Sequence, residues 1–229
     1  MVVHFQNFPS AETEGTVVVA AVPRRTSKGV YASALKRGLD ILMIVLALPV
    51  ALPLIGLMAL LAAADGASPF YRQERIGRGG RVFGLLKIRT MVPNADAQLE
   101  AYLAKNPAAR REWDETQKLK CDPRITRFGR FLRKTSLDEL PQLWNVLKGE
   151  MSIVGPRPMM VDQKALYPGQ AYYRLRPGIT GPWQVSDRNN CSFAGRAKYD
   201  ADYEADLSFA TDLSILLRTV SVVVRGTGY

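Results

Sequence analysis

The chain has 229 residues, enough for one medium-sized domain with an appendage, and carries 31 Lys and Arg against 21 Asp and Glu. Its net charge of +10 indicates a polyanionic partner, such as nucleic acid, an anionic membrane surface or a phosphorylated substrate. The only histidine is His4, so the body of the chain lacks the base that Ser-His-Asp, Cys-His and HExxH sites require. Carboxylates and cations remain as candidate catalytic groups.

The N-terminal stretch shows neither helical nor strand periodicity and is interrupted by prolines and glycines. We predict that residues 1–33 form a flexible arm, which ends in a basic cluster of Arg24, Arg25 and Lys28. The remaining organisation that we predict is a membrane helix over residues 34–65 and a cytosolic domain over residues 66–229.

The segment from Ile41 to Ala64 carries no charge and, at about 1.5 Å per residue, would cross a hydrocarbon core of about 30 Å as a straight helix. Pro49 and Pro53 lie in its middle, and each favours a kink because it lacks a backbone donor. Lys and Arg flank the segment on both sides, which favours the cytoplasmic side for both ends. We therefore predict a Pro-kinked re-entrant helix in the inner leaflet. A spanning helix and a buried core helix are the alternatives.

The rest of the chain predicts a mixture of strands and helices. Residues 70–91 predict a small β-hairpin around the glycines at 77–80, with Lys87 on its second strand. Residues 96–118 predict a polar helix and its extension. In residues 211–226 apolar side chains recur at helical spacing, which suits an amphipathic helix at a membrane interface and equally a helix packed on its own domain. The expected fold class is α+β, a monotopic membrane protein with a mostly helical cytosolic domain.

The adjacent carboxylates Asp138 and Glu139 precede an apolar helical pattern and admit two interpretations. The first is structural: Ser136 and Glu139 have the spacing of a capping box, and Pro141 is tolerated in the first turn of a helix. The second is chemical, because a carboxylate at a helix N-terminus stays ionised and is available as a nucleophile or a magnesium ligand. The two interpretations are compatible with each other.

Several cationic and polar residues are candidate ligand contacts. Arg157 stands between two prolines, which stiffen the backbone that carries this forked anion donor. Gln184 and Arg188 lie in the loop-prone stretch 176–190, whose composition suits a ligand site and also a structural turn. Together with the carboxylate pair, these residues favour a nucleophile that acts on a phosphate held by Arg133, Arg157 and Mg²⁺.

Four motifs in this order are familiar as a set: KRGLDILMIV, YRQERIG with LLKIRTM, RKTSLDELPQLWNVLKGEMSIVGPRP, and RPGITGPWQVSDRN. From residue 35 to residue 229 the chain resembles the bacterial sugar transferase family, the monotopic polyprenyl-phosphate phosphoglycosyl transferases. The likeness is strongest to the exopolysaccharide-type members that move a hexose-1-phosphate. The third motif is highly specific, and the N-terminal arm lies outside the resemblance.

The resemblance implies an enzyme that transfers a phosphosugar from a UDP-hexose to undecaprenyl phosphate and releases UMP. It implies a ping-pong route through a phosphosugar–aspartate intermediate, a requirement for Mg²⁺, and a catalytic domain on the cytoplasmic face of the bacterial inner membrane. The residues that match the family's site are the nucleophile and metal ligand Asp138, its partner Glu139, the phosphate-holding Lys87, Arg133 and Arg157, and Gln184 and Arg188 of the uridine-side loop.

Two departures and three alternatives accompany this interpretation. One alternative is a phosphatase or hydrolase that acts through the same aspartate, with water in place of the lipid acceptor. Leu52 precedes Pro53 where the family often has serine, and Asp187 precedes Arg188 where glycine is common; neither change touches the carboxylate pair. A non-catalytic membrane scaffold of polysaccharide assembly would share the fold. A nucleic-acid-binding protein would suit the net charge, but the long uncharged segment argues against it, and we expect no nucleic-acid partner. The sugar, the polysaccharide and the oligomeric state are left open.

Overall fold

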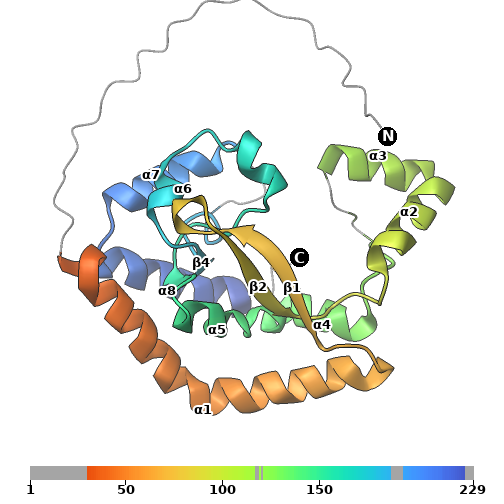
Figure 1. Cartoon of the computed structure of the whole chain (residues 1–229), viewed down its shortest axis with the longest axis horizontal. Helices are drawn as coiled ribbons and strands as arrows, with labels where there is room; N and C mark the ends of the chain where they lie inside the picture. Colours follow the sequence, from red (N-terminus) through yellow and green to blue (C-terminus); the bar gives the residue numbers. More distant parts are fainter. Residues whose placement is uncertain (1–29, 117–118, 120, 187–192, 225–229) are drawn as a thin grey trace, which may run out of the picture.

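The computed structural model describes residues 30–116, 119, 121–186 and 193–224. Within these ranges the chain is α+β, with helices gathered around two small sheets (Figure 1). The strands are β1 (Phe70–Ile76), β2 (Val82–Ile88), β3 (Ser152–Val154) and β4 (Gly178–Thr180). The helices are α1 (Lys36–Ala62), α2 (Ala95–Lys105), α3 (Pro107–Thr116), α4 (Arg127–Thr135), α5 (Gln142–Leu147), α6 (Ala171–Arg174), α7 (Arg196–Ala205) and α8 (Phe209–Val224). The predicted arm and its basic cluster lie almost wholly outside the described residues.

The longest helix, α1, contains both Pro49 and Pro53 and is visibly bent part-way along its length (Figure 1). Together with the short 3₁₀ turn that follows, it forms the one stretch among the described residues that is long and apolar enough to cross a membrane. Large apolar side chains on it are exposed, Leu46 by 71% and Val50 by 74%. The alternative of a buried core helix is therefore wrong, because a core helix would cover these side chains.

Polar contacts tie both ends of α1 to the rest of the domain. Near its start, the buried Asp40 accepts hydrogen bonds from Ser152 Oγ (2.8 Å) and the Ile153 amide (3.0 Å) at β3. At its last residue, the Ala62 carbonyl accepts a hydrogen bond from Arg89 Nη2 at 2.7 Å. A buried carboxylate is costly unless it is hydrogen-bonded, so the Asp40 contacts define how α1 meets β3.

Strands β1 and β2 pair antiparallel around the glycine-rich turn, with Tyr71 opposite Lys87 and Arg75 opposite Phe83. Alternation along the strands places Arg75 and Lys87 on the same face of the hairpin, while Leu86 lies on the other face. The outer edge of β2 is covered by Asn145 of α5: its Nδ2 donates to the Gly84 carbonyl (2.8 Å), and its Oδ1 accepts from the Leu86 amide (3.0 Å). The hairpin is thereby fastened to α5.

The second sheet, β3 and β4, is parallel, and Gly155 follows its first strand. A Cβ at Gly155 would lie 2.3 Å from the Arg176 carbonyl oxygen, so the two backbones approach closely only because this residue is glycine. One face of α8 packs here through Ile215, in a cluster with Val154 and Tyr203. Its other face exposes Leu217 and further apolar side chains. The interpretation as a helix packed on its own domain is therefore confirmed for one face, and the membrane-interface interpretation stays a prediction for the other.

The polar segment between the hairpin and α4 forms two helices, α2 and α3, where we predicted one helix and its extension. The break falls at Asn106, whose backbone is not helical (φ −130°, ψ 89°), and Pro107 opens α3. Because proline disfavours helical geometry in the residue before it, the chain turns at this position and the helix does not run on.

Candidate active site

Asp138 lies in a short 3₁₀ turn, Leu137–Glu139, between α4 and α5. Ser136 ends α4 in the left-handed conformation (φ 57°), and its side chain makes no capping hydrogen bond. The capping-box interpretation is therefore wrong: α5 begins only at Gln142, after Pro141, and a residue that closes the preceding helix cannot also cap the next one with β-region geometry. The carboxylate pair is presented by a turn.

The two carboxylates share one cation. Lys87 Nζ donates to Glu139 Oε1 at 2.7 Å and lies 3.7 Å from Asp138 Oδ2. Burial favours a higher pKa for Glu139, but the charges of Lys87 and Arg157 outweigh it and hold the pKa below its ordinary value. Burial raises the pKa of Asp138 above its ordinary value, and Lys87 offsets only part of that effect. The pair thus consists of an ion-paired glutamate and a more basic aspartate.

Arg133 approaches Asp138 from α4. Its Nε donates to Thr90 Oγ1 at 2.9 Å, which fixes the direction of the guanidinium. Burial lowers the pKa of Arg133, and its charge is one of those that stabilise the Asp138 carboxylate. Asp138 is therefore held between the cations Lys87 and Arg133.

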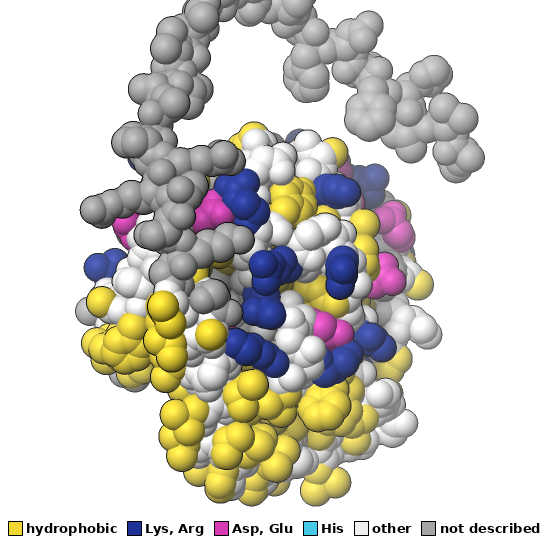
Figure 2. Space-filling model, turned by 60° about the vertical axis from the view of Figure 1, so that its left-hand side comes forward, with side chains coloured by type: hydrophobic (Ala, Val, Ile, Leu, Met, Phe, Trp, Pro, Cys, Tyr) yellow, Lys and Arg dark blue, Asp and Glu magenta, His cyan; other side chains and the backbone are white. Residues whose placement is uncertain are grey.

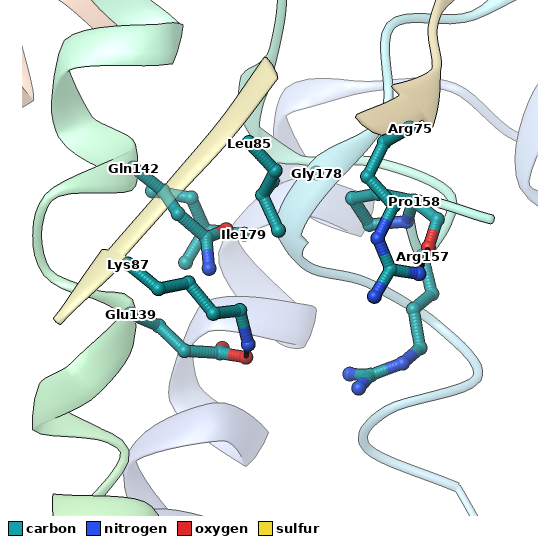
Figure 3. Close-up of a pocket in the computed structure, with 9 residues that line it drawn as sticks. All are labelled: Arg75, Leu85, Lys87, Glu139, Gln142, Arg157, Pro158, Gly178 and Ile179. Carbon is teal, nitrogen blue, oxygen red and sulfur yellow. Dashed lines mark hydrogen bonds and ion pairs between the residues drawn. The ribbon is translucent and has the colours of Figure 1, made fainter. Parts of the chain in front are cut away.

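Two further arginines, Arg75 and Arg157, lie across an open pocket from Lys87 and Glu139 (Figure 3). Arg75 Nη1 donates to the Pro158 carbonyl at 3.0 Å, whereas its buried Nε has no hydrogen-bond partner among the described residues. The Arg157 guanidinium lies 5.8 Å from the centre of the Trp183 ring. An unsatisfied buried guanidinium nitrogen is costly, so this side of the pocket is suited to an anionic ligand.

The structure brings five of the predicted site residues together and places Gln184 apart from them. Glu139, Lys87 and Arg157 line the pocket, Asp138 lies 3.7 Å from Lys87, and the charge of Arg133 acts on Asp138. Gln184 is buried beside Trp183 and does not line the pocket; neither its Nε2 nor its Oε1 has a partner among the described groups. Arg188 lies outside the described residues.

The family model for bacterial sugar transferases matches residues 31–226, which is most of the chain. The chain belongs to the bacterial sugar transferase family. This confirms the resemblance drawn from the motifs and the prediction that the protein is a transferase.

Curated relatives carry the likeness across the same region. The chain is 47% identical over 196 residues to the UDP-galactose-lipid carrier transferase of Erwinia amylovora, covering 85% of this chain and 41% of that protein. It is 48% identical over 196 residues to the exopolysaccharide production protein ExoY of Sinorhizobium fredii, covering 84% of this chain and 87% of that protein. The match to the undecaprenyl-phosphate galactose phosphotransferase of Salmonella typhimurium is 45% over 196 residues and covers 41% of that protein. The chain thus spans well under half of two of these relatives.

Sequence reasoning missed two polar residues of this sugar transferase's pocket, Arg75 and Gln142. Arg75 was counted only as a flanking charge of the membrane segment. The signal that identifies it is strand alternation, since the predicted hairpin already places Arg75 on the face of Lys87. Gln142 is buried at the start of α5, four residues after Asp138, and no motif distinguished it.

The carboxylates available to a metal ion in this transferase are few. Among the described residues no group of three or more His, Cys, Asp and Glu side chains is placed to hold a metal ion. Mg²⁺ commonly binds through one or two carboxylates together with substrate phosphates and waters, and a dedicated protein cage is not required. Asp138 fits that donor set, whereas one oxygen of Glu139 is already engaged by Lys87.

Proposed function

We propose that the protein transfers a hexose-1-phosphate from a UDP-hexose to undecaprenyl phosphate and releases UMP, as the first membrane step of exopolysaccharide or related glycan synthesis. The names of its relatives support this substrate class, since they include a UDP-galactose-lipid carrier transferase and an undecaprenyl-phosphate galactose phosphotransferase. The observation that carries the proposal is the buried Asp138, with its raised pKa, beside Lys87 and Glu139 of a cationic pocket.

The proposed reaction has two displacement steps at phosphorus. First, a carboxylate oxygen of Asp138 attacks the sugar-bearing β-phosphorus of the UDP-hexose; the bond from that phosphorus to the bridging oxygen breaks, and UMP leaves with the electron pair. Second, an oxygen of undecaprenyl phosphate attacks the same phosphorus and displaces the aspartate. The product is a diphosphate-linked lipid sugar, and Asp138 is regenerated as a carboxylate.

The surrounding side chains divide the work. Lys87 and Arg133 hold Asp138 ionised in spite of its burial, and Glu139 keeps Lys87 in place at 2.7 Å. On the opposite wall, Arg75 and Arg157 supply the positive charge on which phosphate oxygens would rest during both steps. Positioning and charge stabilisation of this kind account for most of the catalysis in phosphoryl transfer.

We propose Asp138 as the protein ligand of Mg²⁺, with phosphate oxygens of the substrate completing the coordination. The absence of a carboxylate cage among the described residues agrees with such a shared site. The ion would supply charge neutralisation at the transferring phosphoryl group.

We also propose that α1 enters and leaves the membrane through the cytoplasmic leaflet of the inner membrane. Its two ends support this topology: Lys36 is paired with Asp212 of α8 at 2.5 Å, and Arg89 donates to the Ala62 carbonyl. A helix with both ends bound to one domain does not place its termini on opposite sides of a bilayer. In Figure 2, apolar side chains gather at the bottom of the molecule, and a group of Lys and Arg side chains lies directly above them.

The proposal is tested by UMP release from the purified protein in lipid nanodiscs, with Mg²⁺, undecaprenyl phosphate and a panel of UDP-hexoses. We expect release with one donor, and its loss in Asp138→Asn, which keeps the shape of the side chain and removes the nucleophile. Turnover that persists in Asp138→Asn would contradict the covalent route. If no donor supports release, the non-catalytic scaffold is favoured. If release without the lipid phosphate continues beyond one UMP per protein molecule, water is the acceptor and the protein is a hydrolase.

A further inference from the structure

A second cavity lies on the other side of the catalytic turn. It is an open, apolar groove of about 170 Å³. Its walls come from the bent part of α1, from the hairpin and from α5, through side chains that include Leu48, Leu52, Ile55, Phe70, Leu86 and Trp144. No charged residue lines it. Leu52 is 57% exposed and Trp144 is 59% exposed, so the groove is left uncovered by the described chain.

The groove and the cationic pocket lie on opposite sides of β2 and of the catalytic turn. Along β2, Leu86 lines the groove and the next residue, Lys87, lines the pocket, because consecutive strand residues face opposite sides. Along the catalytic turn, Glu139 lines the pocket and Leu140 lines the groove. At two places in the fold, therefore, one residue lines the cationic pocket and its neighbour in the sequence lines the apolar groove.

We propose that this groove, defined here as the prenyl groove, binds the first isoprenoid units of the lipid acceptor while its phosphate occupies the pocket. The inference rests on the proposed function and deepens it by assigning the residues that select the lipid. The occupant follows from the arrangement: a ligand that has a phosphate at one end and an uncharged branched chain at the other matches a cationic pocket that borders an apolar groove. A straight acyl chain or an apolar helix of another protein would match only the groove.

The first test uses a bulky side chain that fills the groove. Leu52→Trp is paired with Leu46→Trp, a control on the same helix whose side chain is 71% exposed and does not line the groove. We expect Leu52→Trp to raise the KM for undecaprenyl phosphate by about tenfold, since it displaces apolar contacts of the chain. Exchange of labelled UMP into the UDP-hexose, which needs no acceptor, should stay unchanged in both variants. An unchanged KM in Leu52→Trp would overturn the proposal.

The second test does not depend on turnover. A prenyl phosphate with a diazirine near its phosphate end is photolysed with the wild-type protein in nanodiscs, and the labelled peptides are mapped by mass spectrometry. We expect labelling around Leu52, Leu86 and Trp144 that undecaprenyl phosphate competes away. Equal labelling of the same peptides by a diazirine phospholipid would show ordinary bilayer contact and overturn the proposal. Specific prenyl labelling in a protein that releases no UMP would leave the groove assigned while the proposed reaction fails.

Discussion

Lys87 Nζ lies 2.7 Å from Glu139 Oε1 and 3.7 Å from Asp138 Oδ2, so one ammonium group serves two carboxylates. Burial raises the pKa of Asp138, while Lys87 and Arg157 hold the pKa of Glu139 below its ordinary value in spite of its burial. Titratable neighbours whose pKa values are pushed in opposite directions are typical of a site with two roles for similar groups. Here the ionised glutamate positions the lysine, and the aspartate is the nucleophile that we propose.

The first prediction concerns the pH dependence of the wild-type enzyme. The nucleophile must be ionised, and the pKa of Asp138 is raised, so activity should fall on acidification at a higher pH than an ordinary aspartate would dictate. The measurement is kcat/KM for the UDP-hexose, from UMP release, across the acid-to-neutral range. An acid limb at the position of an unperturbed aspartate would argue against Asp138 as the titrating group.

The second prediction concerns Lys87→Met, which keeps the length of the side chain and removes its charge. Without the ammonium the pKa of Asp138 rises further, because burial is then opposed mainly by Arg133. The acid limb of the profile should move to higher pH, and activity at neutral pH should drop by about a hundredfold or more. Lys148→Met, which removes a surface partner of Glu150, serves as the control and should leave the profile unmoved. A lower rate with an unshifted limb would assign Lys87 to phosphate binding alone.

The third prediction concerns Gly129→Ala in α4. Alanine usually stabilises a helix relative to glycine by about 1 kcal/mol. At Gly129, however, a Cβ would lie 2.0 Å from the Thr90 carbonyl oxygen, and backbone cannot move aside as a side chain does. We expect a loss of about 2–4 kcal/mol in the free energy of unfolding, measured by chemical denaturation in detergent.

The matched control for this change is Gly38→Ala, since nothing lies within 4 Å of a Cβ at Gly38 in α1. Its unfolding free energy should stay the same or rise slightly. Equal effects of the two substitutions would contradict the contact between α4 and the segment around Thr90.

The fourth prediction concerns the buried Asp200, which accepts a hydrogen bond from Tyr167 Oη at 2.7 Å. Burial raises the pKa of Asp200 from 3.8 to about 6. Between these two pKa values the folded state holds a proton that the unfolded state releases. The contribution of Asp200 to the free energy of unfolding is therefore complete below pH 3.8 and is lost as the pH rises to about 6. At about 1.4 kcal/mol per pH unit, the loss amounts to about 3 kcal/mol.

The check is the difference in unfolding free energy between the wild type and Asp200→Asn as a function of pH. The variant cannot ionise at this position, so its stability should decline less over that range. Tyr167→Phe removes a hydrogen bond that lowers the pKa of Asp200 and should extend the decline to higher pH. Parallel pH profiles for all three proteins would sink the assignment.

Features that depend on neighbouring residues were predictable from sequence, and features that depend on distant ones were not. The hairpin and the apolar segment follow from alternation, glycines and hydropathy. Ser136 was misassigned because its capping-box spacing is real, but the residue is already used to end α4. The contact of Arg157 with Trp183 joins two loops that no periodicity links. The role that we propose for Asp138 rests on the carboxylate pair and the family motif, because burial and cation contacts are visible only in the fold.

The amide of Asn145 has a consequence for how the fold tolerates change. It binds the backbone of both Gly84 and Leu86, and so fixes which residues of β2 face each side. If the strand slipped by one residue, Leu86 would enter the cationic pocket and Lys87 would enter hydrocarbon. A single-residue insertion in the glycine turn that caused this slip would therefore exchange the side chains that line the cationic pocket with those that line the apolar groove. The two hydrogen bonds of the Asn145 amide oppose that exchange, because they fit only one register of β2.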